Sequence, residues 1–490
     1  MSNLDQLTSW HSNWREVRAV VFGLGVSGFS VADTLAELGA KTLVVAEKAE
    51  ADLLDILDVI GVPYLTGEAA TGVPAEVVEF QPDVIVVSPG IRPQHELLTW
   101  AASKSIQVWV DIDLAWRLRD KTERLAHWFT VTGTNGKTTT VQLLTSMLNA
   151  GGIKAEACGN IGKPILDAIR DPEGFDALVV ELSSFQLHYL GQVYPFSSAV
   201  LNLADDHLDW HGGFEAYRAA KAKVYENTVA ACVYNVMDKA TEEMVENADV
   251  VEGARAIGFT LGIPTRSQVG YVEDILCDRA FLDDRDKNAL EIATLEDIGE
   301  IGVLTPHLMA NVAAATAMAR SAGVEPDRIR HAIRTFKLDA HRIELVAEAD
   351  GVRWIDDSKA TNPHAANASL ASFDRVVWIV GGLLKGVDIS SLVERHRSSL
   401  AAAIVIGVDR AAVLEALANH APEVPVTEIN AESGADVMLA AVQAAARYAI
   451  DGDVVLLAPA AASMDQFKDY ADRGQSFADA VRKRIGGDLG

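Results

Sequence analysis

Short solid apolar runs that end in glycine or polar residues recur along the chain, with amphipathic segments between them. Near the N-terminus these runs are VRAVVFGLG, KTLVVAE and PDVIVVSPG. Between the first two, VSGFSVADTLAELGA predicts a helix that ends at Gly39. Strands that are apolar at every position are typical of parallel sheets covered by helices on both faces. The pattern therefore predicts an α/β domain.

A second set of the same pattern begins at HWFTVTG. The segment TTTVQLLTSMLNA predicts a helix that ends at the glycine pair 151–152, and ALVVELSS and SSAVLNLADDH predict two further strands with polar ends. Open α/β sheets bind their ligands at such strand ends. Residues 308–335 are rich in alanine and predict helix.

A third set predicts strands in VRWIDDSKATN, RVVWIVGGLLKG, AAAIVIGV and DVVLLAPAAAS. The tail MDQFKDYADRGQSFADAVRKRI predicts helix with an interruption near Gly474. A chain of 490 residues is long enough for about three domains. We expect them at residues 1–115, 116–338 and 339–490.

Composition and charge narrow the class of protein. The net charge of −27 argues against a nucleic-acid binder, which needs clustered Lys and Arg. The three cysteines are far apart, which excludes a disulfide framework and fits a reducing compartment. The first residues lack the apolar core of a secretory signal, and no run of about 18 apolar residues exists. We therefore expect a cytoplasmic protein that does not bind a membrane.

The sequence GLGVSG at residues 23–28 follows a predicted strand and precedes a helix, and Glu47 ends the next strand. This is the dinucleotide-binding pattern, in which glycines let the backbone approach a pyrophosphate and the acid reaches a ribose. It predicts a nucleotide site, for which NAD is one candidate. A tight turn that binds nothing is the alternative.

The most specific motif is VTGTNGKTTT at residues 131–140. Glycines turn backbone N–H groups inward, Lys137 meets the outer phosphates of a nucleotide, and a threonine hydroxyl can bind Mg²⁺. Two residues separate Gly133 from Gly136, where the usual phosphate loop has four. A glycine turn that only caps a helix is the alternative.

Other polar residues follow predicted strands. Glu181 could bind Mg²⁺ with its carboxylate, and DDHLDWH (205–211) is as consistent with a polar turn as with a metal site. Lys221 and Lys223 lie in a predicted helix, YRAAKAKVYEN, where a solvated face is the simple interpretation. Further along, DDSKATNP, GGLLKG and SMDQF, the last with a helix N-cap serine, give the third domain a polar edge.

Taken together, GTNGKTT, ELSSFQL, NLADDHLDWHG, YRAAKAKVYEN, AHRIE, DSKATN and SMDQFK resemble the Mur ligases of peptidoglycan synthesis. The motifs run in the same order over nearly the whole chain. The resemblance implies three domains and an ATP-dependent, amide-forming ligase. Its first domain is Rossmann-like and holds UDP rather than NAD, its central domain is of the P-loop ATPase type, and its C-terminal domain is again Rossmann-like. ELSSFQL and DSKATN favour a member that adds D-glutamate to UDP-N-acetylmuramoyl-L-alanine.

The resemblance also implies roles for individual residues of the central site. Lys137, Glu181, His207 and Lys221 are the expected catalytic residues. Two Mg²⁺ ions are expected on Thr138, Glu181, His207 and Lys221, with Lys221 converted by CO₂ to a carbamate. ATP is expected on Gly133, Thr134, Asn135, Gly136, Lys137, Thr138, Thr139, Asn311, Arg342 and Asp357.

For the other substrates, the resemblance implies contacts from Asn160, Lys359, Thr361, Lys385, Ser463 and Tyr470, and on the uracil side from Ser27, Glu47, Lys48, Ser88 and Gly90. The family often has asparagine at Leu308 and phenylalanine at Tyr470. We expect a monomer whose third domain closes over the site before an acyl phosphate forms.

Three rival functions make different predictions. An NAD-dependent oxidoreductase would bind nicotinamide and leaves the phosphate loop without a purpose. A nucleotide switch or scaffold would turn ATP over slowly and without response to amino acids. A sibling ligase, such as a tripeptide or folylpolyglutamate synthase, would add a different amino acid.

Overall fold

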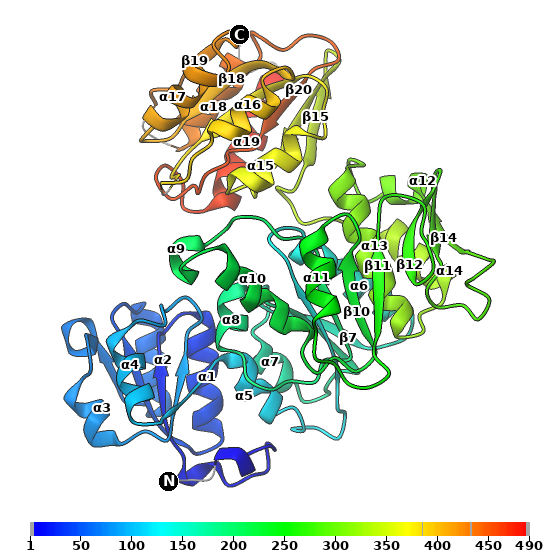
Figure 1. Ribbon diagram of the computed structural model, residues 1–490. Coiled ribbons are helices and arrows are strands. Elements are labelled where there is room, and N and C mark those ends of the chain that lie inside the picture. Colours follow the sequence, from blue (N-terminus) through cyan, green and yellow to red (C-terminus); the bar gives the residue numbers. More distant parts are fainter. Residues whose placement is uncertain (1–3, 385, 432–433, 487–490) are drawn as a thin grey trace. The chain divides into compact units, whose positions relative to one another are not determined.

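A computed structural model describes residues 4–384, 386–431 and 434–486 (Figure 1). The chain divides into two compact units. The first is Met1–Thr294 with Ala310–Ile333, and the second is Leu295–Met309 with Arg334–Gly490. Among the described residues, no helix is both long and apolar enough to cross a membrane.

The first unit begins with a parallel sheet of the order β3-β2-β1-β4-β5. Its strands are β1 (Arg18–Phe22), β2 (Lys41–Ala46), β3 (Tyr64–Thr66), β4 (Val84–Val87) and β5 (Gln107–Trp109). The helices of this part are α1 (Val26–Glu37), α2 (Ala51–Ile60), α3 (Ala75–Phe80), α4 (Glu96–Ser103) and α5 (Asp111–Arg117), with short 3₁₀ turns η1 (Leu4–Gln6), η2 (Trp14–Glu16) and η3 (Gly67–Ala70). The α/β domain expected from the first apolar runs is present, and α1 ends before Gly39 (φ 73°) as predicted.

The second sheet of this unit has the order β14-β13-β12-β11-β10-β9-β6-β8-β7 among the described residues. It is parallel from β7 to β12, and β13 and β14 add antiparallel strands at one edge. Its strands are β6 (His127–Thr132), β7 (Ala155–Gly159), β8 (Ala177–Glu181), β9 (Ser197–Val200), β10 (Ala231–Asn235), β11 (Arg255–Phe259), β12 (Gln268–Val272), β13 (Ile275–Asp278) and β14 (Leu290–Thr294). The helices are α6 (Lys137–Ala150), α7 (Ile165–Ile169), α8 (Ser184–Tyr189), α9 (Leu208–His211), α10 (Phe214–Ala222) and α11 (Lys239–Glu246), with η4 (Lys223–Tyr225).

Polar contacts join the two sheets of the first unit. Arg170 after α7 binds Asp33 (2.5 Å) and Glu37 (2.8 Å) on α1. Tyr189 and Trp210 donate hydrogen bonds of 2.7 and 3.1 Å to the carbonyls of Ile91 and Gly90. The loop after β4 is therefore fixed against the segments that follow β8 and β9.

The alanine-rich stretch 308–335 is helical, but it forms two helices rather than one. They are α13 (Pro306–Ser321) and α14 (Pro326–Thr335), which follow the short α12 (Leu295–Gly299). Gly323 between them has φ 78°, and Pro326 begins α14, since proline suits the first turn of a helix. The helix predicted at 217–227 is likewise shorter, because α10 ends at Ala222 and continues as η4.

The second unit is built on a sheet of order β15-β16-β20-β17-β18-β19, parallel except for β15. Its strands are β15 (Glu344–Ala349), β16 (Val352–Asp356), β17 (Val376–Gly381), β18 (Leu400–Ile406), β19 (Val426–Glu428) and β20 (Val454–Leu457). The helices are α15 (Pro363–Leu370), α16 (Ser390–His396), α17 (Ala411–His420), α18 (Gly434–Ala445) and α19 (Tyr470–Ile485). Alternate residues of β17 enter different cores: Trp378 packs on one face, and Val377 and Ile379 on the other. Burial on both faces explains why this strand is apolar at every position.

The prediction for the tail was wrong in two respects. The helix α19 runs through Gly474 without interruption, and it begins at Tyr470 with Asp469 as N-cap, not at Ser463. Ser463 lies in a turn, where its carbonyl accepts from the amides of Gln466 and Phe467.

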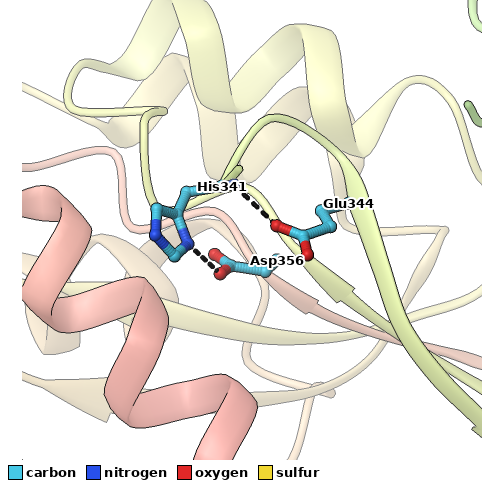
Figure 2. Close-up of side chains that lie close together, drawn as sticks. All are labelled: His341, Glu344 and Asp356. Carbon is cyan, nitrogen blue, oxygen red and sulfur yellow. Dashed lines mark hydrogen bonds and ion pairs between the residues drawn. The ribbon is translucent and has the colours of Figure 1, made fainter. Parts of the chain in front are cut away.

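Gly474 is required by close packing rather than by a break in the helix. A Cβ atom at this position would clash with His341 Nδ1 and Asp356 Oδ2. These two atoms form a 2.6 Å hydrogen bond, and the backbone amide of His341 donates to Glu344 (2.8 Å; Figure 2). The half-buried His341 and the fully buried Asp356 thus lie against the backbone of α19.

Candidate active site

The phosphate loop joins β6 to α6 in the first unit, as the sequence predicts. Gly136 adopts φ 83° as the N-cap of α6, and a Cβ atom there would clash with the side-chain amide of Asn311. Glycine is needed both for this backbone conformation and for the approach of Asn311. Gly136 and Asn311 are both candidates for the ATP site. They are therefore neighbours in space although they lie 175 positions apart in the sequence.

The loop is held by its own polar groups. Thr134 is buried, and its hydroxyl contacts Tyr217 Oη (2.9 Å) and accepts from the amide of Ala204. Asn135 and Asn202 exchange two hydrogen bonds of 2.9 and 3.0 Å. Lys137 Nζ donates to the carbonyls of Gly133 and Thr134, both at 2.9 Å. The lysine is thereby folded back over the loop at the N-terminus of α6, where an anion is stabilised.

Glu181 ends β8 beside this loop and receives two hydrogen bonds. Thr138 Oγ1 donates to Glu181 Oε2 and Asn160 Nδ2 donates to Oε1, both at 2.9 Å. Thr139 follows in α6 and is buried. Parallel pairing of β6 with β8 and of β7 with β8 brings these three strand ends to one edge. The hydroxyl and the carboxylate are oxygen donors of the kind that Mg²⁺ prefers.

Lys221 is buried within the first unit. The residue is 2% exposed, and Nζ donates to the Gly133 carbonyl (2.9 Å) and Thr132 Oγ1 (3.2 Å). Burial and the nearby charge of Lys137 lower the pKa of Lys221 well below its ordinary value. The solvated-face interpretation is wrong for this residue. Lys223 differs, because its ammonium lies near the surface and donates to the His188 carbonyl (2.9 Å).

His207 has φ 53° and immediately precedes α9. Its ring packs on Phe185 (4.7 Å between centroids), and Nε2 lies 3.5 Å from Asp206 Oδ2. Burial lowers the pKa of His207, and the positive charges of Lys137 and Lys221 act in the same direction. The neutral imidazole favoured here is the form that binds metals.

The uracil-side candidates lie at the ends of β1, β2 and β4. A Cβ atom at Gly23 would clash with Ser88, and the Ser88 hydroxyl oxygen is buried without a hydrogen-bond partner. Glu47 and Lys48 are exposed after β2, and Glu47 Oε1 lies 3.7 Å from His95 Nε2. A buried hydroxyl without a partner beside a glycine turn fits a site that a polar ligand completes.

The remaining candidates belong to the second unit, and Asp357, Lys359 and Thr361 follow the end of β16 in sequence. Asp357 is buried and accepts from Ser369, and burial raises its pKa to about 6. The ammonium of Lys359 lies 3.7 Å from the centroid of the Tyr470 ring, a cation–π contact. Arg342 precedes β15, Thr361 follows β16 in sequence, and Ser463 lies in the turn after β20. Lys385 lies outside the described residues.

Several polar residues in these sites were not found from the sequence. Arg473 is fully buried in α19 and donates to Ser358 Oγ (2.9 Å), the Ser358 carbonyl (2.8 Å) and the Ala461 carbonyl (3.1 Å). Tyr217 and Asn202 support the phosphate loop, as described above. Their residue types are common on surfaces, so no spacing signal distinguishes them.

The strand–loop–helix with its lysine, and the Thr138–Glu181 pair at the ends of parallel strands, define an α/β protein of the nucleotide-phosphate-binding class. Family models match the chain in three segments. They are the Mur ligase MurD-like N-terminal domain at residues 17–110, the Mur ligase middle domain at 131–319, and the Mur ligase glutamate ligase domain at 341–461. The chain belongs to the Mur ligase family.

Two relatives are similar over nearly the whole chain, and both are named UDP-N-acetylmuramoylalanine–D-glutamate ligase. The protein of Leifsonia xyli subsp. xyli is 57% identical, over 99% of this chain and 96% of its own. That of Streptomyces avermitilis is 50% identical, over 96% and 99%. The structure of MurF ligase from Thermotoga maritima in complex with ADP has a TM-score of 0.53 and 18% identity, covering 99% of this chain and 100% of that one. The expected three-domain α/β fold is confirmed. The boundaries expected at 115 and 338 fall between the matched segments and stay predictions.

Proposed function

We propose that the protein uses ATP to join D-glutamate to UDP-N-acetylmuramoyl-L-alanine, as a cytoplasmic step of peptidoglycan precursor synthesis. The observation that carries the proposal is a complete phosphate loop beside Glu181 in a chain that is 57% identical to a D-glutamate ligase. In the proposed reaction the alanyl carboxylate attacks the γ-phosphate of ATP, which forms an acyl phosphate and releases ADP. The amine of D-glutamate then attacks the carbonyl carbon and releases phosphate.

Charge neutralisation by this chain supports the first step. A carboxylate and a triphosphate repel each other, so their approach requires nearby positive charge. Lys137 lies over the loop, where its ammonium can exchange the Gly133 and Thr134 carbonyls for phosphate oxygens. The loop amides and the N-terminus of α6 add partial positive charge.

The donor set near the loop fits divalent cations. Thr138 and Glu181 offer a hydroxyl and a carboxylate oxygen, and His207 a neutral imidazole. Two Mg²⁺ ions held there would screen the phosphate charge and stabilise the oxygens of the transferred group. Asn160 orients Glu181 by donating to its second oxygen.

Lys221 could bind the second cation only after its amine is chemically modified, because an ammonium group repels Mg²⁺. Burial disfavours its charged form, and a neutral amine is the form that attacks CO₂. The nitrogen would form a bond to the CO₂ carbon and lose a proton, giving a carbamate whose anionic oxygens suit a hard cation.

The other substrates are assigned by domain. The orphaned Ser88 hydroxyl supports binding of the UDP group near Ser27, Glu47, Lys48 and Gly90. In the second unit, Lys359, Thr361, Ser463 and Tyr470 are proposed to bind D-glutamate, and Arg342 and Asp357 to bind the nucleotide. Lys359 offers a positive charge that suits an anionic amino acid.

The test is a phosphate-release assay with a panel of substrates. Release should require ATP, UDP-N-acetylmuramoyl-L-alanine and D-glutamate together, and Lys137→Ala should abolish it. A rate that is indifferent to D-glutamate, or that responds better to another amino acid, would overturn the specific assignment in favour of a sibling ligase.

A further inference from the structure

The loop after β4 is fixed by two aromatic side chains to which the proposed reaction gives no role. Trp210 on α9 is 6% exposed, and its Nε1 donates to the Gly90 carbonyl (3.1 Å). Tyr189 at the end of α8 donates from its hydroxyl to the next carbonyl, that of Ile91 (2.7 Å). The rings of Trp210 and Tyr189 also contact each other, with centroids 6.1 Å apart. Consecutive carbonyls of this loop are therefore bound by α8 and α9.

α9 makes a second contact with the same loop. Arg92 Nη2 lies 2.6 Å from Asp209 Oδ2, and Arg92 Nη1 donates to the Asp209 carbonyl (3.5 Å). Both side chains are exposed, so this ion pair by itself contributes little to stability. It adds a charge contact beside the buried hydrogen bond of Trp210. Two neighbouring residues of α9 thus bind positions 90 and 92 of the loop.

His207, a proposed metal ligand, immediately precedes α9. This helix has only four residues, so side-chain contacts rather than its own hydrogen bonds fix its orientation. The His207 carbonyl accepts from the amides of Trp210 and His211, both at 3.1 Å. The rings of His207 and Trp210 both pack on Phe185, at 4.7 and 4.6 Å between centroids. Because a single turn joins the two residues, a shift of Trp210 displaces His207 as well.

We infer that Trp210 is a positioning residue that fixes the Gly90 loop, proposed for the UDP group, relative to His207 at the proposed metal site. The inference rests on the proposed function for its ligands. One substrate molecule must reach from the UDP site to the γ-phosphate of ATP, so the two sites need a constant separation. Misplacement by about 1 Å far from the reacting atoms can cost about 100-fold in rate.

The central variant is Trp210→Phe, which keeps an aromatic ring at this position but removes the indole N–H. With the Gly90 carbonyl no longer bound, the Kd for UDP should rise about fivefold, as expected for the loss of one neutral hydrogen bond. The Kd for ADP, proposed to bind at the phosphate loop, should stay within about twofold, and kcat on the proposed substrates should fall about tenfold. Hydrogen exchange of the amides at residues 88–92 should become faster.

Trp14→Phe is the matched control. Trp14 is 1% exposed, and its indole donates a hydrogen bond of 2.9 Å to the Ser9 carbonyl. The variant therefore loses the same kind of contact within the same unit. It should lower stability and leave unchanged both the Kd for UDP and the hydrogen exchange at residues 88–92.

Asp209→Asn tests the second contact without disturbing the core, since this side chain is exposed. At low salt its Kd for UDP should be about twofold above that of the wild type. The ratio of the two Kd values should approach unity at high salt, because the ion pair is then screened. The corresponding ratio for Trp210→Phe should not depend on salt, because the lost hydrogen bond is buried and uncharged.

Equal Kd values for UDP in the wild type and a folded Trp210→Phe would overturn the inference, as would an equal rise in Trp14→Phe. If Trp210→Phe does not fold, Asp209→Asn decides, and an unchanged Kd for UDP at low salt contradicts the inference. The hydrogen-exchange measurement needs neither ligand nor turnover. A wild type that neither binds UDP nor turns over the proposed substrates would refute the proposed function, while exchange at residues 88–92 would still show whether Trp210 fixes the loop.

Discussion

At the scale of single residues, burial distinguishes the polar side chains that can take part in the reaction from those that only contact solvent. Lys221 and Lys223 are two positions apart in one amphipathic segment, yet one is 2% exposed and the other reaches the surface. Removing an ammonium from water disfavours its charge, and this effect sets Lys221 apart.

The Lys221→Ala variant should lose most of its activity, because no carbamate can form there. A short carboxylate such as acetate should restore part of it by supplying an anionic oxygen. Phosphate release at several carboxylate concentrations measures this. Lys223→Ala is the matched control and should retain activity, and full activity in Lys221→Ala would contradict the carbamate.

The His341–Asp356 pair makes the stability of the second unit depend on pH. Asp356 raises the pKa of His341, so the folded state keeps the proton to a higher pH than the unfolded state. The stabilisation is complete below the ordinary histidine pKa and is lost as pH rises through the folded value. The free energy of unfolding of the wild type should exceed that of His341→Asn by about 1–3 kcal/mol near pH 6 and by less near pH 9.

Denaturant unfolding of both proteins at several pH values, followed by hydrogen exchange of β16, measures the difference. A stability difference between the two proteins that grows as pH rises above 7 would show that protonation of His341 does not stabilise the folded state.

At the scale of elements, glycine has two different roles in helices of this chain. At Gly323 a left-handed φ separates α13 from α14. At Gly474 the helix continues, and the missing side chain makes room for the His341–Asp356 pair. A sequence pattern cannot distinguish these roles, because both read as glycine within a helical stretch.

Gly474→Ala should therefore destabilise the second unit by about 1–3 kcal/mol, because the added methyl group forces the pair or the helix to move. Gly299→Ala is the control, since open space surrounds that position in α12. It should be neutral or slightly stabilising, as alanine favours helix over glycine. Thermal or denaturant unfolding measures both variants, and an unchanged midpoint in Gly474→Ala would refute the packing argument.

At the scale of the whole molecule, the net charge of −27 opposes self-association. We expect sedimentation equilibrium at moderate ionic strength to give the mass of one chain, 52.5 kDa. A stable species of twice that mass would contradict the expected monomer.

The sequence by itself determined the α/β class, the order of the motifs and the place of the phosphate loop. Strands buried on both faces must be apolar at every position, and a phosphate loop must carry glycine and lysine at set places. Both requirements are local, so they can be recognised along the chain.

Only the tertiary structure decided which distant polar groups meet. Asn311 lies against Gly136, Asp111 binds Gln186, and Lys221 is buried under the phosphate loop. Such contacts arise from the pairing order of strands and from helix packing, which bring together residues far apart in number. The free energy of a buried charge depends on those neighbours, and no spacing along the chain records them.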